Sequence, residues 1–490
     1  MATQAEKLAQ SLEVLTELRD EGRTAIRSRN LTRTHRERLL AAGFLQEVMK
    51  GWYIPSLPDQ AEGESTAWYV SYWGFCADYL GMRFGDDWYL SPEQSLLLHA
   101  GNNTIPKQLL VRSKKGDNNP VSLPHETSLL TVRTSISDSA ALEVKDGIRI
   151  YSLAAALIAV APDFFARHEV DAYAALAQIS NASEVLPVLL DQGRTTIAGR
   201  LAGAFEKMGR TRIADDIVQA MRAAGYEIRK RDPFLNLRAN PPIIPLPVDS
   251  APPHVHRLQL LWSKMREPVI SCFPQAPAAP VDVTAYLKSV EETYTTDAYH
   301  SLSIEGYQVS KELIERVRSG RWTPDAHPDG NEQDRSHRNA LAAKGYWQAF
   351  QQVQKSLERV LGGENPGIVV DEDHGSWYRE MFAPGVAAGL IRPSDLAGYR
   401  NGPVFISRSR HVPPRSVVVR DLMPAFFELL RTEEDPAARV LLGHFVFVFI
   451  HPYLDGNGRI GRFLMNVMLA SGGYPWVVIP VEQRDTYMTS

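Results

Sequence analysis

Near its C-terminus the sequence concentrates side chains that could carry out chemistry on a phosphate. Within twelve residues it places a basic nitrogen, a carboxylate, an amide between two glycines, and two guanidiniums: His451, Asp455, Gly456, Asn457, Gly458, Arg459 and Arg462. His451 is the member of this group that can accept a proton near pH 7. Asp455 offers the hard oxygen ligand that Mg²⁺ prefers. The group therefore combines a base, a metal ligand and cationic anchors.

Two apolar segments must position this group, one before it at 445–450 and one after it at 463–469. Their order predicts a helix, an anion-binding loop and a second helix. The glycines beside Asn457 tolerate φ > 0, so the loop can turn its backbone N–H groups into one concavity where the second helix begins. Arg459 and Arg462 lie one helical turn apart, so both guanidiniums can reach one polyphosphate. A lone histidine or a lone Gly-Asn-Gly turn would be structural, but the combined spacing favours a nucleotide site.

This spacing, H-P-[aromatic]-x-D-G-N-G-R-x-x-R, resembles the Fic family, whose pattern is H-x-F-x-[D/E]-G-N-G-R-x-x-R. Tyr453 stands where the family has phenylalanine, and we expect it to pack as an anchor in the same way. The resemblance implies that the chain is a protein adenylyltransferase, which moves a nucleoside monophosphate, usually AMP from ATP, to a Ser, Thr or Tyr hydroxyl of a protein.

The resemblance also implies a role for each residue of the motif. His451 is the base for the incoming hydroxyl, and Asp455 holds Mg²⁺. The family's nucleotide-binding positions correspond to Gly456, Asn457, Gly458, Arg459 and Arg462. The first three hold the α- and β-phosphates, Arg459 supports the β-phosphate and Arg462 meets the γ-phosphate. In the Doc branch a lysine at the place of Gly458 accompanies kinase activity, so the glycine here favours nucleotidyl transfer.

A second motif precedes the first by about 150 residues. Ser301, Glu305 and Gly306 fit the family's [S/T]-x-x-x-E-[G/N] pattern, and their place corresponds to the class with an N-terminal inhibitory helix. We expect the carboxylate of Glu305 to form a bidentate pair with Arg462 and so to compete with the γ-phosphate. The alternative is a surface glutamate at a helix end. The preceding helix is predicted to begin at a Thr284 cap.

Between the two motifs, the residues at 403–406 and 411–412 predict a β-hairpin around a polar turn at Arg408 and Ser409. In the family a hairpin at this place is the flap that clamps the target by adding a strand to it. Strand addition reads little of the side chains, so the target protein is not specified. The family continues beyond the position of Ser490 into a helix that helps to enclose the adenine, which leaves the preferred base open.

At the other end of the chain, arginines cluster between two short predicted elements. A helix is expected at 5–20, a second helix after a Thr32 cap, and a strand pair at 44–54 that turns at Lys50 and Gly51. This order predicts a winged helix that binds duplex DNA. The arginines expected to contact the DNA are Arg27, Arg29, Arg33, Arg36 and Arg38. The alternative is a solvated basic helix face.

The following region alternates strands with helices, including one with a Ser91 cap and Pro92 in its first turn. Together with the basic opening it resembles AbiEi-type antitoxin regulators of toxin–antitoxin systems, in which an α/β domain follows a winged helix. Prolines then crowd 241–280 and predict a stiff linker with a short helix at 258–265. The predicted organisation is 1–60 winged helix, 61–240 α/β region, 241–280 linker and 281–490 mainly α-helical Fic-like domain.

The composition limits the classes of protein that the chain can belong to. With 490 residues and 44% hydrophobic content it can form two or three globular domains. The net charge of −4 carries no global nucleic-acid or membrane signature. Two distant cysteines, no leader pattern and no apolar run of about 18 residues predict a soluble, cytoplasmic protein without a membrane partner.

The sequence therefore predicts a multidomain, autoinhibited adenylyltransferase that uses ATP and Mg²⁺, with self-modification and homo-oligomers as further expected associations. Two alternatives stay open. The chain can be a DNA-binding regulator, or an antitoxin-like protein, in which the Fic-like domain senses nucleotide. It can also be an enzyme that removes AMP.

Overall fold

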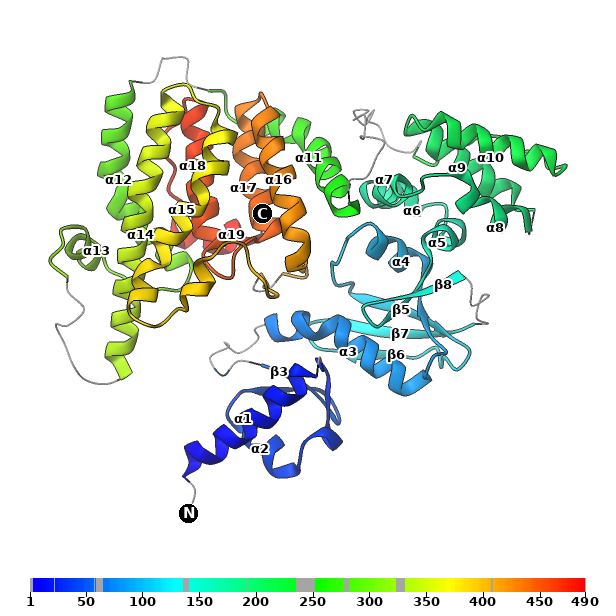
Figure 1. Cartoon of the computed structure of the whole chain (residues 1–490), viewed down its shortest axis with the longest axis horizontal. Helices are drawn as coiled ribbons and strands as arrows, with labels where there is room; N and C mark the ends of the chain where they lie inside the picture. Colours follow the sequence, from blue (N-terminus) through cyan, green and yellow to red (C-terminus); the bar gives the residue numbers. More distant parts are fainter. Residues whose placement is uncertain are drawn as a thin grey trace. The chain divides into compact units, whose positions relative to one another are not determined.

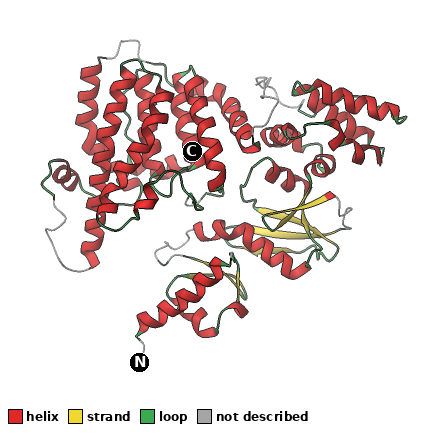
Figure 2. Cartoon of the chain, viewed as in Figure 1, coloured by secondary structure: helices red, strands yellow, loops and turns green. Residues whose placement is uncertain are grey.

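The computed structural model divides the chain into two compact units. The first comprises Met1–Leu260 with Val404–Pro413, and the second Leu261–Pro403 with Pro414–Ser490. The residues described are 3–56 without 22, 58, 65–134, 141–234 without 192, 252–276, 282–322 and 331–489 without 407 and 408. In the described part every strand belongs to the first unit, and the second unit consists of helices and loops (Figures 1 and 2).

The N-terminal part of the first unit has the predicted order of elements. Helices α1 (Gln4–Asp20) and α2 (Arg33–Ala41) pack beside a sheet of order β1-β3-β2, with strands at Ile26–Arg27, Trp52–Pro55 and Leu45–Met49. The hydroxyl of Thr32 accepts from the backbone N–H of His35, which confirms the predicted cap. Strands β2 and β3 pair antiparallel, as predicted. That this module is a winged helix that binds DNA stays a prediction.

A mixed sheet follows, with strands in the order β4-β5-β7-β6. Its strands span Tyr89–Leu90, Gln108–Ser113, Thr127–Arg133 and Pro120–Leu123, and a separate hairpin joins β8 (Leu142–Lys145) to β9 (Ile148–Tyr151). The aromatic helix α3 (Thr66–Phe84) packs on β3 and β9. The other helices of this part are α4 (Pro92–His99), α5 (Leu153–Ala159), α6 (Phe164–Arg167), α7 (Glu169–Ala177), α8 (Leu186–Asp191), α9 (Thr195–Lys207) and α10 (Thr211–Ala223). The predicted Ser91 cap of α4 is confirmed, because its hydroxyl accepts from the Gln94 N–H.

The expected proline-rich linker is in part a helix. Helix α11 covers Pro253–Cys272 without interruption, so the short helix predicted at 258–265 is much longer in the structure. Pro253 opens the helix, where the missing N–H costs nothing, and Pro268 is tolerated inside it. The prolines at 241, 242, 245, 247, 277 and 280 lie outside the described residues. The two cysteines, Cys76 and Cys272, are both free.

The second unit packs long helices around the motif. These are α12 (Val283–Ile304), α13 (Lys311–Arg318), α14 (Asn331–Leu361), α15 (Pro366–Ala387), α16 (Ser416–Thr432), α17 (Pro436–Ile450), α18 (Asn457–Ser471) and α19 (Arg484–Thr489). Helix α18 packs against α14, α15 and α17, and 13 of its 15 residues are buried. Helix α12 begins at an Asp282 cap, not at Thr284, because the Asp282 carboxylate accepts from the Ala285 N–H. No helix in the described part of the chain has the length and apolarity needed to cross a membrane.

The predicted hairpin at 403–412 is wrong for the residues that the structure describes. Residues 403–406 and 409–415 contain no strand, whereas 407 and 408 lie outside the described residues. Two features of the backbone explain the missing strands. Pro413 and Pro414 have no N–H to give to a ladder. The carbonyl of Pro414 instead accepts from the guanidinium of Arg400, and that of Arg410 accepts from the Ile105 N–H.

Candidate functional site

The predicted helix, loop and helix are α17, residues 451–456 and α18. Both ends of the loop have left-handed backbone, with φ +54° at His451 and +79° at Gly456. Gly456 is the N-cap residue of α18 and adopts this conformation without steric strain, because it has no Cβ. In His451 the Cβ makes the same conformation unfavourable. The first turn of α18 therefore lies directly after the loop, and its backbone N–H groups have no partner within the helix.

The imidazole of His451 has a fixed orientation. Its Nδ1 lies 3.0 Å from the carbonyl oxygen of Val448, one turn back in α17. A carbonyl can only accept, so Nδ1 carries the hydrogen and Nε2 has the lone pair when the ring is neutral. Burial lowers the pKa of His451, and the positive charge of Arg400 lowers it further. His451 can therefore act as a base at Nε2.

The loop is closed by the side chain of Asn457. Its amide Oδ1 accepts from the Tyr453 N–H at 2.9 Å, and its Nδ2 donates to the Tyr453 carbonyl, also at 2.9 Å. The ring of Tyr453 is buried and stacks on Tyr378 with centroids 3.9 Å apart. This confirms that Tyr453 packs as an anchor. It also shows that the amide of Asn457 shapes the loop, so its own contribution to a ligand would come from the backbone.

Asp455 lies on the open side of the loop. Its side chain is 63% exposed, and its Oδ2 lies 3.2 Å from Nη2 of Arg459. Its other oxygen accepts from the Gly456 N–H at 2.5 Å. In the described part of the chain no three His, Cys, Asp or Glu side chains gather as a metal cluster. An exposed single carboxylate beside a helix N-terminus nevertheless fits Mg²⁺ that arrives with a nucleotide, because that ion takes one or two carboxylates and completes its shell with phosphates and water.

Arg459 is a buried cation, and one of its N–H groups has no hydrogen-bond partner among the described residues. Its side chain is 2% exposed, and the guanidinium lies between the rings of Tyr307 and Phe382, at 5.3 and 5.1 Å from their centroids. Its Nε is buried and has no hydrogen-bond partner among the described residues. An orphan N–H on a buried guanidinium next to a helix N-terminus fits an anionic ligand.

Arg462 is held by the end of α12. Its Nη2 donates to Oε1 of Glu305 at 2.7 Å and to the carbonyl of Ser301 at 3.0 Å, and its Nε donates to the Ser301 hydroxyl at 3.0 Å. Partial burial would raise the pKa of Glu305, but the charges of Arg462 and Arg459 outweigh it and the pKa is lowered. The expected bidentate pair is wrong in detail, because one oxygen of Glu305 accepts from Nη2 of Arg462, and Nε of Arg462 donates to the Ser301 hydroxyl instead.

Gly458 marks the closest approach between the two motifs. A Cβ at this position would lie 2.4 Å from Oε1 of Glu305 and 3.2 Å from Nη1 of Arg462. The last residue of the inhibitory pattern, Gly306, ends the helix with φ +89°. The structure thus brings both predicted motifs, separated by about 150 residues in the sequence, into one site.

The five arginines predicted to contact DNA belong to the first unit and already have protein partners in several cases. The guanidinium of Arg27 lies 5.3 Å from the Trp52 ring centroid, and Arg33 pairs with Glu37 at 2.7 Å. Arg36 donates to the Ser28 carbonyl at 3.3 Å and Arg38 to the Lys7 carbonyl at 3.4 Å. Arg29 and Arg33 are exposed. None of these contacts identifies a nucleic acid.

Several residues of the site escaped the sequence analysis. Tyr307 and Phe382 flank Arg459, and Arg400 contacts the backbone of the loop. Arg400 follows Tyr399 in the segment from which the hairpin was predicted, but no local pattern shows that it reaches His451. Tyr307 and Phe382 are far from the motif in the sequence, so only the three-dimensional structure shows that they flank Arg459.

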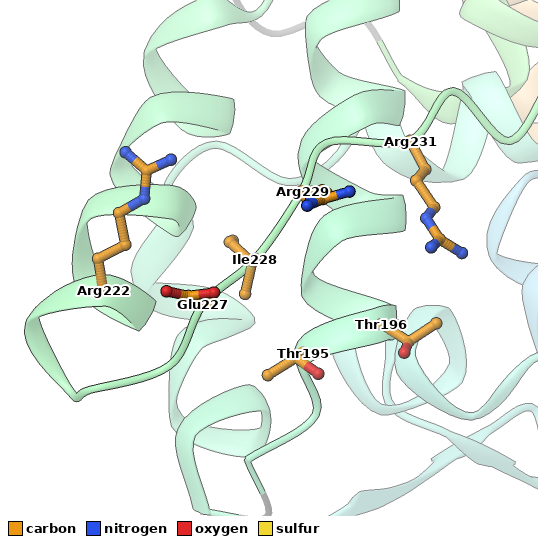
Figure 3. A pocket seen from close by; sticks show the side chains of 7 residues that line it. All are labelled: Thr195, Thr196, Arg222, Glu227, Ile228, Arg229 and Arg231. Atoms are coloured by element: carbon orange, nitrogen blue, oxygen red, sulfur yellow. The ribbon is translucent and has the colours of Figure 1, made fainter.

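A cavity of about 570 Å³ lies in the first unit, apart from the motif (Figure 3). It is lined by Thr195, Thr196, Arg222, Glu227, Ile228, Arg229 and Arg231. Its lining combines three arginines with Glu227, and all three arginines are exposed. The cavity contains none of the predicted site residues.

Comparison with known proteins finds a family match in the C-terminal part of the chain. Residues 375–469 match the Fic/DOC family. The chain is 29% identical over 208 residues to a protein adenylyltransferase Fic of Drosophila mojavensis, covering 42% of this chain and 37% of that protein. It is 29% identical over 212 residues to protein adenylyltransferase fic-1 of Caenorhabditis elegans, covering 42% and 38%. A Fic domain-containing signaling protein of Bacteroides thetaiotaomicron aligns with a TM-score of 0.33 and 18% identity over 48% of this chain and 79% of that one. The chain spans less than two fifths of the length of these two adenylyltransferases.

Proposed function

The C-terminal region of the chain contains a Fic domain, and on that premise we propose that the protein transfers AMP from ATP to a Ser, Thr or Tyr hydroxyl of a protein. The observation that supports this most is the orientation of His451. Its Nδ1 is tied to Val448, so Nε2 is the basic atom, and it lies on the loop that opens α18. A proton acceptor beside a helix N-terminus is the arrangement that attack of a hydroxyl on a phosphate requires.

The proposed step needs little from the protein beyond position and charge. Nε2 of His451 takes the proton of the incoming hydroxyl, whose oxygen attacks the α-phosphorus. The bond to the bridging oxygen breaks, and pyrophosphate leaves with the electron pair. The backbone N–H groups at Gly456, Asn457 and Gly458 and the orphan Nε of Arg459 stabilise the charge on the phosphates.

Asp455 would hold Mg²⁺ in this scheme. The ion supplies charge neutralisation on the phosphates when it is bound. Without the ion, the carboxylate rests against Arg459 and the Gly456 N–H, and both of these donors are ones that the phosphates would use. Both donors therefore become available to the phosphates only when the carboxylate of Asp455 leaves them.

The end of α12 supports a proposal of autoinhibition. Arg462 is the residue expected to meet the γ-phosphate, and three of its hydrogen bonds go to Ser301 and Glu305. ATP that enters while this contact persists cannot use Arg462, so its α-phosphorus is held out of line with the hydroxyl. Small misplacements of this kind cost orders of magnitude in rate.

Label transfer from two forms of ATP tests the proposal. The whole chain, as wild type and as Glu305→Gly, is incubated with a lysate and ATP labelled either at the α- or at the γ-phosphate. We expect protein-bound label only from the α-position, and a mass increase of one AMP on the modified peptides. Label from the γ-position instead would show kinase activity, and no label from either form would contradict the proposal.

A second candidate function is DNA binding by the first unit. It is supported by two exposed arginines near the start of α2, Arg29 in the short 3-10 helix Ser28–Asn30 and Arg33 as the first residue of α2. Phosphate contacts by arginines weaken steeply with salt. The full chain should shift labelled duplex DNA at low salt, and a variant with both arginines replaced by alanine should shift it several-fold less. Binding that is absent at low salt, or indifferent to salt, would contradict this function.

A further inference from the structure

Arg400 is a buried arginine that contacts the backbone of the site. Its side chain is 3% exposed, and it donates to three consecutive carbonyls at the end of α17. Its Nη2 reaches the Ile450 oxygen at 3.4 Å, its Nε the His451 oxygen at 2.7 Å, and its own backbone N–H the Pro452 oxygen at 2.9 Å. The last carbonyls of a helix have no partner within the helix, so Arg400 satisfies groups that would otherwise be orphaned.

The same guanidinium closes the segment that follows it. Its Nη1 donates to the Gly402 carbonyl at 3.0 Å, and its Nη2 donates to the Pro414 carbonyl. Arg400 therefore joins both ends of 402–414 to the residue that carries the proposed base. The segment between these ends is the one that corresponds to the target-clamping flap of the resembled family.

This use of a buried cation is energetically demanding. All of the hydrogen-bond acceptors found for Arg400 in the described part of the chain are main-chain carbonyls, and burial lowers the pKa of its guanidinium to about 10. Burial of a cation without a carboxylate is unfavourable unless its donors are well satisfied. A neutral side chain would avoid this cost, but it would lack the five N–H donors with which arginine binds several carbonyls at once.

These hydrogen bonds act on the backbone at His451. Its φ of +54° is left-handed, a conformation that is unfavourable for a residue other than glycine. In this conformation the chain turns sharply between α17 and the loop, and the imidazole is directed by that turn. The hydrogen bonds from Arg400 to the carbonyls on both sides of the turn favour this conformation over the relaxed ones.

We infer that Arg400 is a positioning residue for His451, which fixes the left-handed turn that aims Nε2 at the substrate hydroxyl. This inference rests on the proposed function. Arg400 itself touches neither nucleotide nor hydroxyl in this scheme. Its loss should therefore lower the rate of transfer and leave nucleotide affinity intact, because the phosphates are held by α18.

The test compares Arg400→Gln and Arg400→Lys with a matched control. The control is Arg392→Gln, which removes an arginine of the same segment whose side chain is 81% exposed and pairs with Asp395. All variants are made in the full chain carrying Glu305→Gly. We expect Arg400→Gln to lower kcat at least ~100-fold with the KM and Kd for ATP within about 2-fold, as for loss of orientation at the reacting centre. Lysine, a single point donor, should restore only part of kcat, and Arg392→Gln should change nothing.

A spectroscopic readout separates this inference from the proposed function. In the full chain labelled with ¹⁵N-histidine, the His451 signals are assigned by their loss in His451→Asn. We expect the Nδ1–H signal of His451 to shift or broaden in Arg400→Gln and to stay unchanged in Arg392→Gln. This measurement holds even if the wild type transfers no AMP, in which case the proposed function fails and the role of Arg400 is still decided.

Three results would overturn the inference. The first is an unchanged kcat and an unchanged His451 signal in a folded Arg400→Gln chain. The second is a loss of kcat that is matched by an equal loss of ATP affinity. The third is unfolding of both the Gln and the Lys variants at the assay temperature, because Arg400 would then be needed for general stability and not for the turn at His451.

Discussion

Oε1 of Glu305 lies 2.7 Å from Nη2 of Arg462, so the last turn of α12 and the middle of α18 share one ion pair in an otherwise buried site. The pair joins an acid from one motif to an arginine from the other. Because the carboxylate is the only charged acceptor that Arg462 is seen to use among the described residues, its removal should free the guanidinium for a phosphate.

Glu305→Gly is therefore expected to raise AMP transfer at least ~10-fold, a barrier change of about 1.4 kcal/mol. The measurement is transfer of labelled AMP at equal enzyme concentration. Addition of Arg462→Ala should cancel the gain. Glu292→Gly, at an exposed position of the same helix, is the matched control for loss of a helical glutamate. If Glu305→Gly is no faster than wild type, the end of α12 does not inhibit this chain.

Replacement of His451 should separate chemistry from binding. His451→Ala removes the proton acceptor and leaves the N–H groups of α18 and both arginines in place. We expect transfer to fall by at least ~100-fold, within the range for loss of a general base, and the ATP dissociation constant to change little. Calorimetric titration with ATP and the label-transfer assay give the two quantities. Undiminished transfer would remove His451 from the mechanism.

The acidic limb of the pH–rate profile should lie below pH 6.5. Burial lowers the pKa of His451 and Arg400 lowers it further, while Glu305 and Asp455 raise it less, so the imidazole stays neutral and basic below its ordinary pKa. Glu305→Gly removes one of the negative charges, so its acidic limb should lie lower still. The profile of kcat/KM between pH 5 and 8 tests both statements. A limb that moves upward in Glu305→Gly would contradict the assignment of the base.

A glycine in α14 should control the packing beneath the site. A Cβ on Gly345 would lie 1.8 Å from the Met381 carbonyl of α15, so Gly345→Ala must separate the two helices. We expect a loss of about 1–3 kcal/mol in the free energy of unfolding, measured with urea. Gly375→Ala in α15 is the control, because its Cβ would meet only the flexible end of Arg379 and should stabilise the helix by about 0.5–1 kcal/mol. Equal effects of the two changes would contradict the close approach.

Several helix starts and the motif loop could be predicted from the sequence, because both depend on local chemistry. The caps at Thr32 and Ser91, and the glycine that opens α18, lie where the residue types predicted them. The pairing of Glu305 with Arg462 also followed from the resemblance of both motifs to one family. Its bidentate form did not, because the hydroxyl and carbonyl of Ser301 also accept from Arg462, a contact across 161 residues that no local pattern shows.

Other features could not be predicted for the same physical reason. The hairpin at 403–412 was expected from β-branched and aromatic residues, but the structure shows no strand at 403–406 or 409–412, and the Arg410 carbonyl accepts from the Ile105 N–H. Asp282 and Thr284 are both N-cap residue types, and the structure caps α12 with Asp282, whose carboxylate accepts from the Ala285 N–H. The role of Arg400 depends on contacts across 50 residues of sequence.

The contact between Arg462 and the Ser301 carbonyl affects how this protein can evolve. A side-chain contact can be deleted by one codon change, as at Glu305, but a main-chain oxygen is present whatever residue occupies position 301. A point mutation at Glu305 can therefore remove the ion pair, whereas the contact of Arg462 with this carbonyl stays. Its complete loss requires displacement or deletion of the end of α12, so variants with partial activity should be common in a random library and fully released ones should arise mainly through truncation.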